Sequence, residues 1–275
     1  MRSFVAHRHI APLVESFSEG YDACLIESVF RHAAGRFYLD LAANDPIRGS
    51  NTYLLDRVYN WSGVCIEPQQ KHGGRFVVHR TCQLVQSVVS DVPVSFVEHR
   101  GSGLTSGISG LDNKHEPGQP VPVASIRDIL RVTGTPRRID YLSLDCEGSE
   151  LNVMNSFPFA EHSIGAMTVE RPPAALHRLL LRHGMCASHN GGSPATCDVL
   201  YLNRSWLQRQ ELSVPAARPS KKGSAMRSSQ SHLRHEWPAR PAEACPSKPF
   251  PPQMNVAPED LCTPAPLHTD RPVWR

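Results

Sequence analysis

Acidic side chains stand at the ends of three short apolar runs in this chain. Asp40 lies near the end of the run Phe37 to Leu41, Glu67 follows a second run, and Asp145 and Glu147 follow a third. Such runs are typical of strands buried on both faces of a parallel sheet. Ligands of open α/β sheets bind at the carboxyl ends of the strands. The sequence therefore predicts a site at which these carboxylates face a shared pocket.

The residues that follow Asp40 could present a helix N-terminus to a ligand. Ala42 to Ser50 is a turn of small and polar residues, and Leu54, Val58 and Trp61 then repeat at helical spacing. A strand, a small-residue turn and a helix in this order expose backbone N–H groups to an anion. Ser50 could cap the helix. We expect the ligand site to begin here, at residues 40 to 44.

The rest of residues 20 to 212 alternates between strand and helix patterns. This alternation predicts a parallel sheet with helices on both faces. Arg100 to Pro122 is polar and rich in glycine, and we expect a loop over the carboxyl edge of the sheet. The further strands are predicted at Cys82–Val89, Val92–His99, Ile139–Leu144, Ala166–Glu170 and Cys197–Asn203, the last of them paired antiparallel with Met185–Ser188.

Composition favours an ordinary globular domain without a membrane span. Of the 275 residues, 40% are hydrophobic, and no apolar run is long enough to cross a bilayer. The basic N-terminus lacks the apolar stretch of a secretory signal, so a cytoplasmic location is expected. Eight cysteines are far apart, and Cys65, Cys82 and Cys146 fall in or beside core strands. Reduced thiols in a reducing compartment are therefore predicted, with a disulfide framework as the alternative.

The basic charge of the chain is concentrated in its C-terminal tail. The net charge is +3 overall, but residues 1–212 carry −1 and residues 213–275 carry +4. The tail has 12 prolines and few aliphatic residues, so we expect disorder there. The predicted organisation is an extension over 1–19, one domain over 20–212 and a disordered basic tail over 213–275. The folded part offers no nucleic-acid surface, although the tail could contact a protein partner.

Six stretches form a recognisable pattern: Tyr38–Asp45, Ser50–Thr52, Cys65–Pro68, Ile139–Leu151, Val169–Arg171 and Asp198–Tyr201. Together they resemble the FkbM-type methyltransferases, in that family's order and rough spacing. The resemblance covers residues 36 to 204. It implies a class I, Rossmann-like fold that binds S-adenosylmethionine, with a seven-stranded sheet whose last strand is antiparallel. Better-known members methylate hydroxyl groups of sugars or polyketide-like products, so a small-molecule or glycan hydroxyl is the expected acceptor.

The resemblance implies roles for the donor-binding residues. The donor's carboxylate suits the backbone N–H groups of Ala42 to Asn44 and the helix start near Ser50. Asp40 suits the donor's ammonium group, or else it orders the turn. Glu67 can accept both ribose hydroxyls, or else it is a solvated strand end. The adenine is expected near Val89, Ser90 and Asp91.

The acids after the fourth strand are expected to meet the acceptor. Methyl transfer to an alcohol requires in-line approach of the oxygen and removal of its proton. Asp145 is predicted to orient or deprotonate the hydroxyl. Glu147 is predicted beside it, although an acid before Gly148 could instead complement the dipole of the following helix. No metal is expected, because Cys186, His189 and Cys197 lack a fourth ligand at zinc spacing.

Departures from the family pattern leave two other functions open. Family members usually have glycine at the position of Ala42 and again near Pro46, and commonly have lysine at the position of Ser143. A positive φ at Ala42 would cost about 1 kcal/mol. The alternative is therefore a catalytically impaired domain that serves as a protein-interaction module. A second alternative is nucleic-acid binding through the tail.

Overall fold

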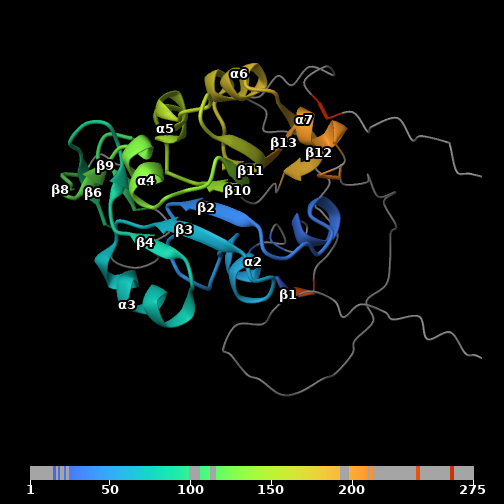
Figure 1. Ribbon diagram of the computed structural model, residues 1–275. Helices are drawn as coiled ribbons and strands as arrows, with labels where there is room; N and C mark the ends of the chain where they lie inside the picture. Colours follow the sequence, from blue (N-terminus) through green and yellow to red (C-terminus); the bar gives the residue numbers. More distant parts are fainter. Residues whose placement is uncertain are drawn as a thin grey trace, which may run out of the picture.

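The protein is built around one seven-stranded sheet (Figure 1). Its structure is a computed structural model that describes residues 15–16, 18, 22, 25–98, 106–111, 116–192, 198–209, 211–213, 240–241 and 261–262. In order across the sheet, the strands are β12 (Met185–Gly192), β13 (Asp198–Asn203), β11 (Ser163–Glu170), β10 (Arg138–Leu144), β2 (Phe37–Leu41), β3 (Ser62–Ile66) and β4 (Gln83–Val85).

All strands of this sheet are parallel except β13. This last strand lies between β11 and β12 and runs antiparallel to both. Each parallel strand pairs with its neighbour in the spatial order β11, β10, β2, β3 and β4. The predicted seven-stranded, mostly parallel sheet with an antiparallel last strand is confirmed. A right-handed crossover between parallel neighbours needs a helix, which explains the alternation seen in the sequence.

Helices cover both faces of the sheet, as predicted. On one face α4, α5 and α6 share a hydrophobic cluster with Leu39 and Leu41 of β2, and on the other η1, α2, α3 and α7 share a cluster with Tyr38. Alternate residues of a buried strand thus serve two separate hydrophobic clusters. In the described part of the chain, none of the helices combines the length and apolar character of a membrane span. The helices are the π-helical η1 (Leu25–Val29), α2 (Tyr53–Arg57), α3 (Gln70–His79), α4 (Ile126–Val132), α5 (Glu150–Ser156), α6 (Ala174–Arg182) and α7 (Arg204–Gln208).

Short strands outside the main sheet stand beside its carboxyl edge. The predicted strand Cys82–Val89 divides in two, because its second half leaves β4 and pairs with β9. Part of the predicted polar loop forms β7 and β8, which flank β6 in a small sheet. Residues 100–105 and 112–115 of that loop lie outside the described residues. These strands are β5 (Val88–Val89), β6 (Ser95–Val97), β7 (Gly107–Ile108), β8 (Gln119–Pro120) and β9 (Val123–Ala124), and β1 (Glu15–Ser16) pairs separately with β14 (Arg240–Pro241).

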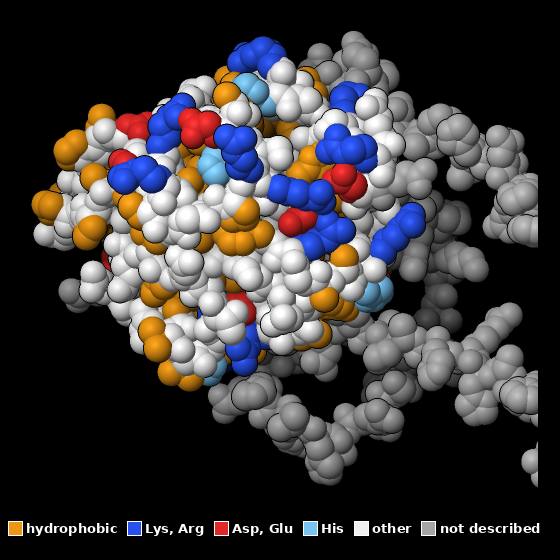
Figure 2. Space-filling view, viewed as in Figure 1, with side chains coloured by type: hydrophobic (Ala, Val, Ile, Leu, Met, Phe, Trp, Pro, Cys, Tyr) orange, Lys and Arg blue, Asp and Glu red, His pale blue; other side chains and the backbone are white. Residues whose placement is uncertain are grey.

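Basic and acidic side chains are interleaved on the face shown in Figure 2. Ion pairs join Arg127 to Glu161 and both Arg138 and Arg209 to Glu211. Exposed pairs of this kind contribute little to stability. They keep these basic side chains beside acidic ones.

Two disulfides correct the prediction of reduced core thiols. Cys65 bonds to Cys82, and Cys186 bonds to Cys262. Cys65 lies opposite Leu84 in the register of β3 and β4, so the crossover through α3 brings Cys82 to it. Sequence spacing alone could not reveal this contact. Among the described cysteines, Cys146 is free, as predicted.

The second disulfide fastens part of the C-terminal tail to the sheet. Cys262 is fully buried, its N–H donates to the carbonyl of Ala187, and Leu261 pairs with Ala187 in parallel. These residues lie beyond the predicted domain end at residue 212. The rest of the tail, apart from 213 and 240–241, lies outside the described residues, as does most of the extension over 1–19. The predicted domain limits stay a prediction.

Reduction is expected to lower the unfolding free energy by about 2–5 kcal/mol for each disulfide, because each closes a loop in the unfolded chain, with sequence separations of 17 and 76. Thermal unfolding with and without dithiothreitol measures the change. Cys146→Ser is the control, since it removes a thiol that bonds to no other described cysteine and should leave the response to reductant intact. Recovery of Cys65 and Cys82 on separate, unlinked peptides from non-reduced protein would contradict the pairing.

Candidate active site

The carboxyl ends of β2, β3 and β10 border a cavity of ≈ 80 Å³. It brings together five of the residues predicted from the sequence. The matching ends of the strands explain why, since residues 41, 66 and 144 stand level with one another across the sheet. The five are Ala42, Asn44, Glu67, Asp145 and Glu147.

The backbone at this edge is strained in several places. Ala42 and Asn44 have φ values of 59° and 50°, Glu147 has 52° and Arg171 has 41°. Residues other than glycine rarely adopt this left-handed region, and they do so at some energetic cost. All four follow the carboxyl ends of β2, β10 or β11 directly or within a few residues. Such strain persists where surrounding contacts impose it, and it is concentrated at functional sites.

Replacing Ala42 with glycine is expected to stabilise the protein by about 0.5–1 kcal/mol. Glycine removes the left-handed strain, and the greater entropy of the unfolded chain offsets part of that gain. Chemical denaturation of the variant and the wild type measures the difference. Asn44→Gly is the matched control and should gain less, because asparagine tolerates this conformation. A lower stability in Ala42→Gly would contradict the assignment of strain to this residue.

Glu67 fastens two turns together at the cavity wall. Its carboxylate accepts a hydrogen bond from the N–H of Asn44 at 2.7 Å and another from the N–H of Gln69 at 2.8 Å. The side chain is buried, and burial raises the pKa of this carboxyl despite the two N–H donors. The alternative of a solvated strand end is therefore wrong. A carboxylate has about four acceptor positions, so Glu67 retains some for a ligand hydroxyl.

Two of the backbone N–H groups predicted to bind a ligand carboxylate are already used. The N–H of Ala43 donates to the carbonyl of Ile66, and that of Asn44 donates to Glu67. These bonds hold the turn after β2 against the turn after β3. An anion at this place would need other donors.

Asp40 and Ser50 are buried and do not line the cavity. Asp40 is buried and accepts a hydrogen bond from the hydroxyl of Thr52, and burial raises the pKa of its carboxyl. The hydroxyl of Ser50 accepts from the N–H groups of Thr52 and Tyr53, although the N-cap residue of α2 is Thr52 and not Ser50. Of the two roles considered for Asp40, this arrangement matches the ordering of the turn.

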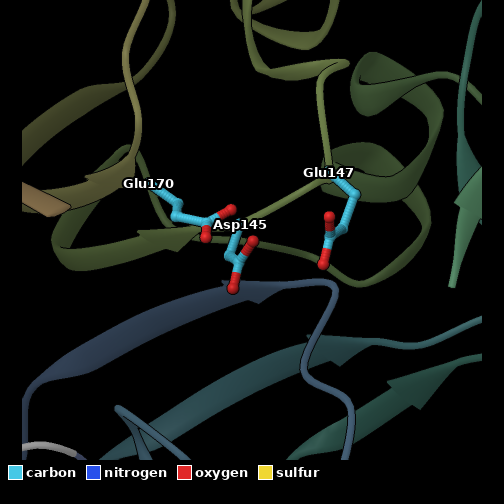
Figure 3. Close-up of side chains that lie close together, drawn as sticks. All are labelled: Asp145, Glu147 and Glu170. Atoms are coloured by element: carbon cyan, nitrogen blue, oxygen red, sulfur yellow. The ribbon is translucent and has the colours of Figure 1, made fainter. Parts of the chain in front are cut away.

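Three carboxylates converge at the ends of β10 and β11 (Figure 3). Oxygens of Asp145, Glu147 and Glu170 all lie within 4.8 Å of one another. The side chain of Asp145 is exposed to solvent, but the protein atoms around it still disfavour its charged form and Glu170 adds repulsion, so the pKa of Asp145 is raised well above its ordinary value. Like charges this close favour a shared proton or a bound cation. Arg171 offsets part of the repulsion through contacts with Glu147 and Glu170.

Glu147 does not stand in the first turn of a helix. Helix α5 begins at Glu150, which is the acid of its first turn. Glu150 is buried and accepts hydrogen bonds from the N–H groups of Cys146 and Gly148. The alternative role considered for Glu147 therefore belongs to Glu150. Glu147 is left facing the cavity.

A second cavity of ≈ 460 Å³ adjoins the first and shares Val89, Ile108 and Ser149 with it. Ser90 and Asp91, at which the adenine was predicted, line this second cavity and are absent from the wall of the first. The first cavity alone is smaller than the roughly 300–1,000 Å³ typical of small-molecule sites. The two together fall within that range.

Sequence reasoning missed two residues of the site. The hydroxyl of Ser87 is buried in the first cavity's wall and has no hydrogen-bond partner among the described residues. Buried hydroxyls are normally bonded, so this one is suited to a polar ligand group or a water molecule. Glu170 was seen only as part of a strand. A lone serine before a hydrophobic pair carries no signal in sequence, whereas an acid at the end of a fifth strand could have been noticed.

A family model described as Methyltransferase FkbM domain matches residues 40–178. This segment contains every residue named above as lining the first cavity. No curated protein matches the chain.

Proposed function

The chain belongs to the FkbM methyltransferase family, and on that basis we propose that it transfers a methyl group from S-adenosylmethionine to a hydroxyl group of a small-molecule or glycan acceptor. The observation that carries this proposal is the meeting of Glu67 and Asp145 at one cavity. One carboxylate is suited to a ribose and the other to an acceptor hydroxyl, and they come from different strands.

The nucleoside part of the donor fits the residues present. Glu67 keeps acceptor positions for ribose hydroxyls, and Ser87 offers a buried hydroxyl that has no partner among the described residues. The nucleobase would occupy the second cavity beside Ser90 and Asp91. Val89 lines both cavities, so a nucleoside could extend from one to the other past its side chain. When bound, the donor supplies an electrophilic methyl group.

Asp145 would orient the acceptor hydroxyl and take its proton. The carboxylate lies in the first cavity, and its raised pKa makes it a better base than an ordinary aspartate. Glu147 and Glu170 lie close enough to repel negative charge on Asp145 and thereby favour uptake of the proton. Arg171 would hold these two glutamates in place.

Titration calorimetry with S-adenosylmethionine and with its demethylated product tests the proposal. Binding of both, followed by transfer of labelled methyl to a hydroxylated acceptor, is the expected result. Absence of heat and of thermal stabilisation at millimolar ligand would overturn it. That outcome would support the alternative, a domain that binds a protein partner, which is favoured by the strained Ala42 and the small first cavity.

We further propose that the protein resides in an oxidising compartment and not, as predicted, in the cytoplasm. Disulfides persist outside the reducing cytosol, and two of them join parts of this domain. Non-reducing electrophoresis of the protein trapped with a thiol-alkylating reagent in intact cells tests this point. Full alkylation of Cys65 and Cys82 would restore the cytoplasmic prediction.

A further inference from the structure

Arg80 is a buried cation with all five of its N–H groups bonded. Its side chain is 0% exposed, as is that of its ion-pair partner Asp56. A guanidinium carries five N–H donors in a fixed planar arrangement. Here the Nε group donates to Asp56, and the two terminal nitrogens donate to Pro46, Ser50, Tyr38 and Thr52.

Three of these five bonds reach a single loop. We call residues 42–52, which join β2 to α2, the donor loop. Arg80 donates to the carbonyl of Pro46 and to the hydroxyl of Ser50, both at 3.2 Å, and to the hydroxyl of Thr52 at 2.6 Å. The same loop carries the cavity-lining residues Ala42 and Asn44.

The other two bonds attach Arg80 to the scaffold. Asp56 of α2 accepts from Nε at 2.8 Å, and the hydroxyl of Tyr38 on β2 accepts at 3.0 Å. Asp56 is held in turn by the N–H and hydroxyl of Thr81. The guanidinium therefore lies between the fixed sheet and helix on one side and the donor loop on the other.

We propose that Arg80 is a positioning residue for methyl transfer. Its three hydrogen bonds to the donor loop fix that loop so that Ala42 and Asn44 face the donor. This inference rests on the proposed function. The loop holds two residues in the left-handed region, so without the hydrogen bonds from Arg80 its backbone would relax. Burial of a charged group is costly unless every donor is satisfied, and a lysine could not replace this planar set of donors.

A matched pair of variants separates positioning from simple stability. The hydroxyls of Thr52 and Tyr38 occupy equivalent places, since each is buried, accepts from the same Arg80 nitrogen and donates to an aspartate, Asp40 or Asp56. Thr52 belongs to the donor loop and Tyr38 to the sheet. Thr52→Val and Tyr38→Phe thus remove similar bonds from opposite sides of the guanidinium.

Thr52→Val is expected to raise the Kd for S-adenosylmethionine about tenfold, the equivalent of one hydrogen bond, while Tyr38→Phe changes it little at a similar loss of Tm. Hydrogen exchange should be faster at the amides of residues 44–50 in Thr52→Val only. Arg80→Lys should resemble Thr52→Val in both measurements if it folds.

Equal changes of Kd in the two matched variants, or an unchanged Kd in Thr52→Val, would overturn the inference. If the wild type binds no donor, the proposed function fails and the exchange rates alone decide whether Arg80 fixes the loop. Equal exchange in Thr52→Val and Tyr38→Phe would then reject the positioning role.

Discussion

Replacing Asp145 with asparagine is expected to lower kcat for methyl transfer by roughly 10²- to 10⁴-fold, the range that a general base contributes. The amide keeps the size of the side chain but cannot take the acceptor's proton. The Kd for the donor should change little, because Glu67 and Ser87, the groups assigned to the donor, remain in place. Steady-state kinetics with labelled donor and direct calorimetry measure the two quantities separately.

Glu170→Gln is the matched control for Asp145→Asn. Glu170 belongs to the same carboxylate cluster but is absent from the cavity wall, so its loss should change kcat far less than the loss of Asp145 does. A large fall in kcat for Glu170→Gln together with a small one for Asp145→Asn would show that Asp145 is not the base.

The pH dependence follows from the raised pKa of Asp145. Because the base must be ionised, kcat/KM should rise with pH through this pKa, and Glu170→Gln should move the midpoint to lower pH by removing repulsion. A raised folded pKa also means that the ionised carboxylate opposes folding above the pKa of the unfolded chain. Asp145→Asn should therefore have a higher Tm at neutral pH, and the difference should vanish in acid, where Asp145 is protonated in both states.

Replacing Glu67 with glutamine is expected to raise the donor Kd by about 10- to 100-fold and to lower the unfolding free energy by about 1–3 kcal/mol. The amide can accept from only one of the N–H groups of Asn44 and Gln69, which leaves the other buried donor unsatisfied. It also offers one acceptor atom fewer to a ribose. Calorimetry with the donor and denaturant unfolding measure the two effects.

Asp45→Asn provides the comparison for Glu67→Gln. The Asp45 carboxylate accepts from the N–H groups of Ile47 and Arg48 through Oδ1, and its other oxygen forms an ion pair with Arg75, which the amide would weaken. Asp45 lies in the donor loop without lining the cavity. Its replacement should lower stability with a much smaller effect on the donor Kd. Equal losses of affinity in the two variants would show that Glu67 acts only through the shape of the loop.

Much of the fold could be derived from residue pattern because the strands are short, apolar and buried on both faces. The runs 37–41 and 139–144 became β2 and β10 at nearly the expected limits. The alternation of helix and strand, with right-handed crossovers, then determines which ends of the strands meet. For this reason Glu67, Asp145 and Glu147 could be assigned to one edge of the sheet before the structure was known.

Other features depend on contacts between distant residues and leave no local pattern. Asp40 and Glu67 look alike in sequence, but only Glu67 lines the cavity. The carboxylate of Asp40 instead accepts from Thr52, in the hydrogen-bond network around Arg80. Arg80, which completes that network, lies directly after α3, and no pattern in the neighbouring residues marks its role. The disulfide between Cys65 and Cys82 likewise depends on the register of β3 and β4. The sequence by itself therefore determined the sheet and the edge that carries the site, since those follow from periodicity and chirality. Which carboxylates face the cavity was decided by side-chain packing across the chain, and only the tertiary structure contains that information.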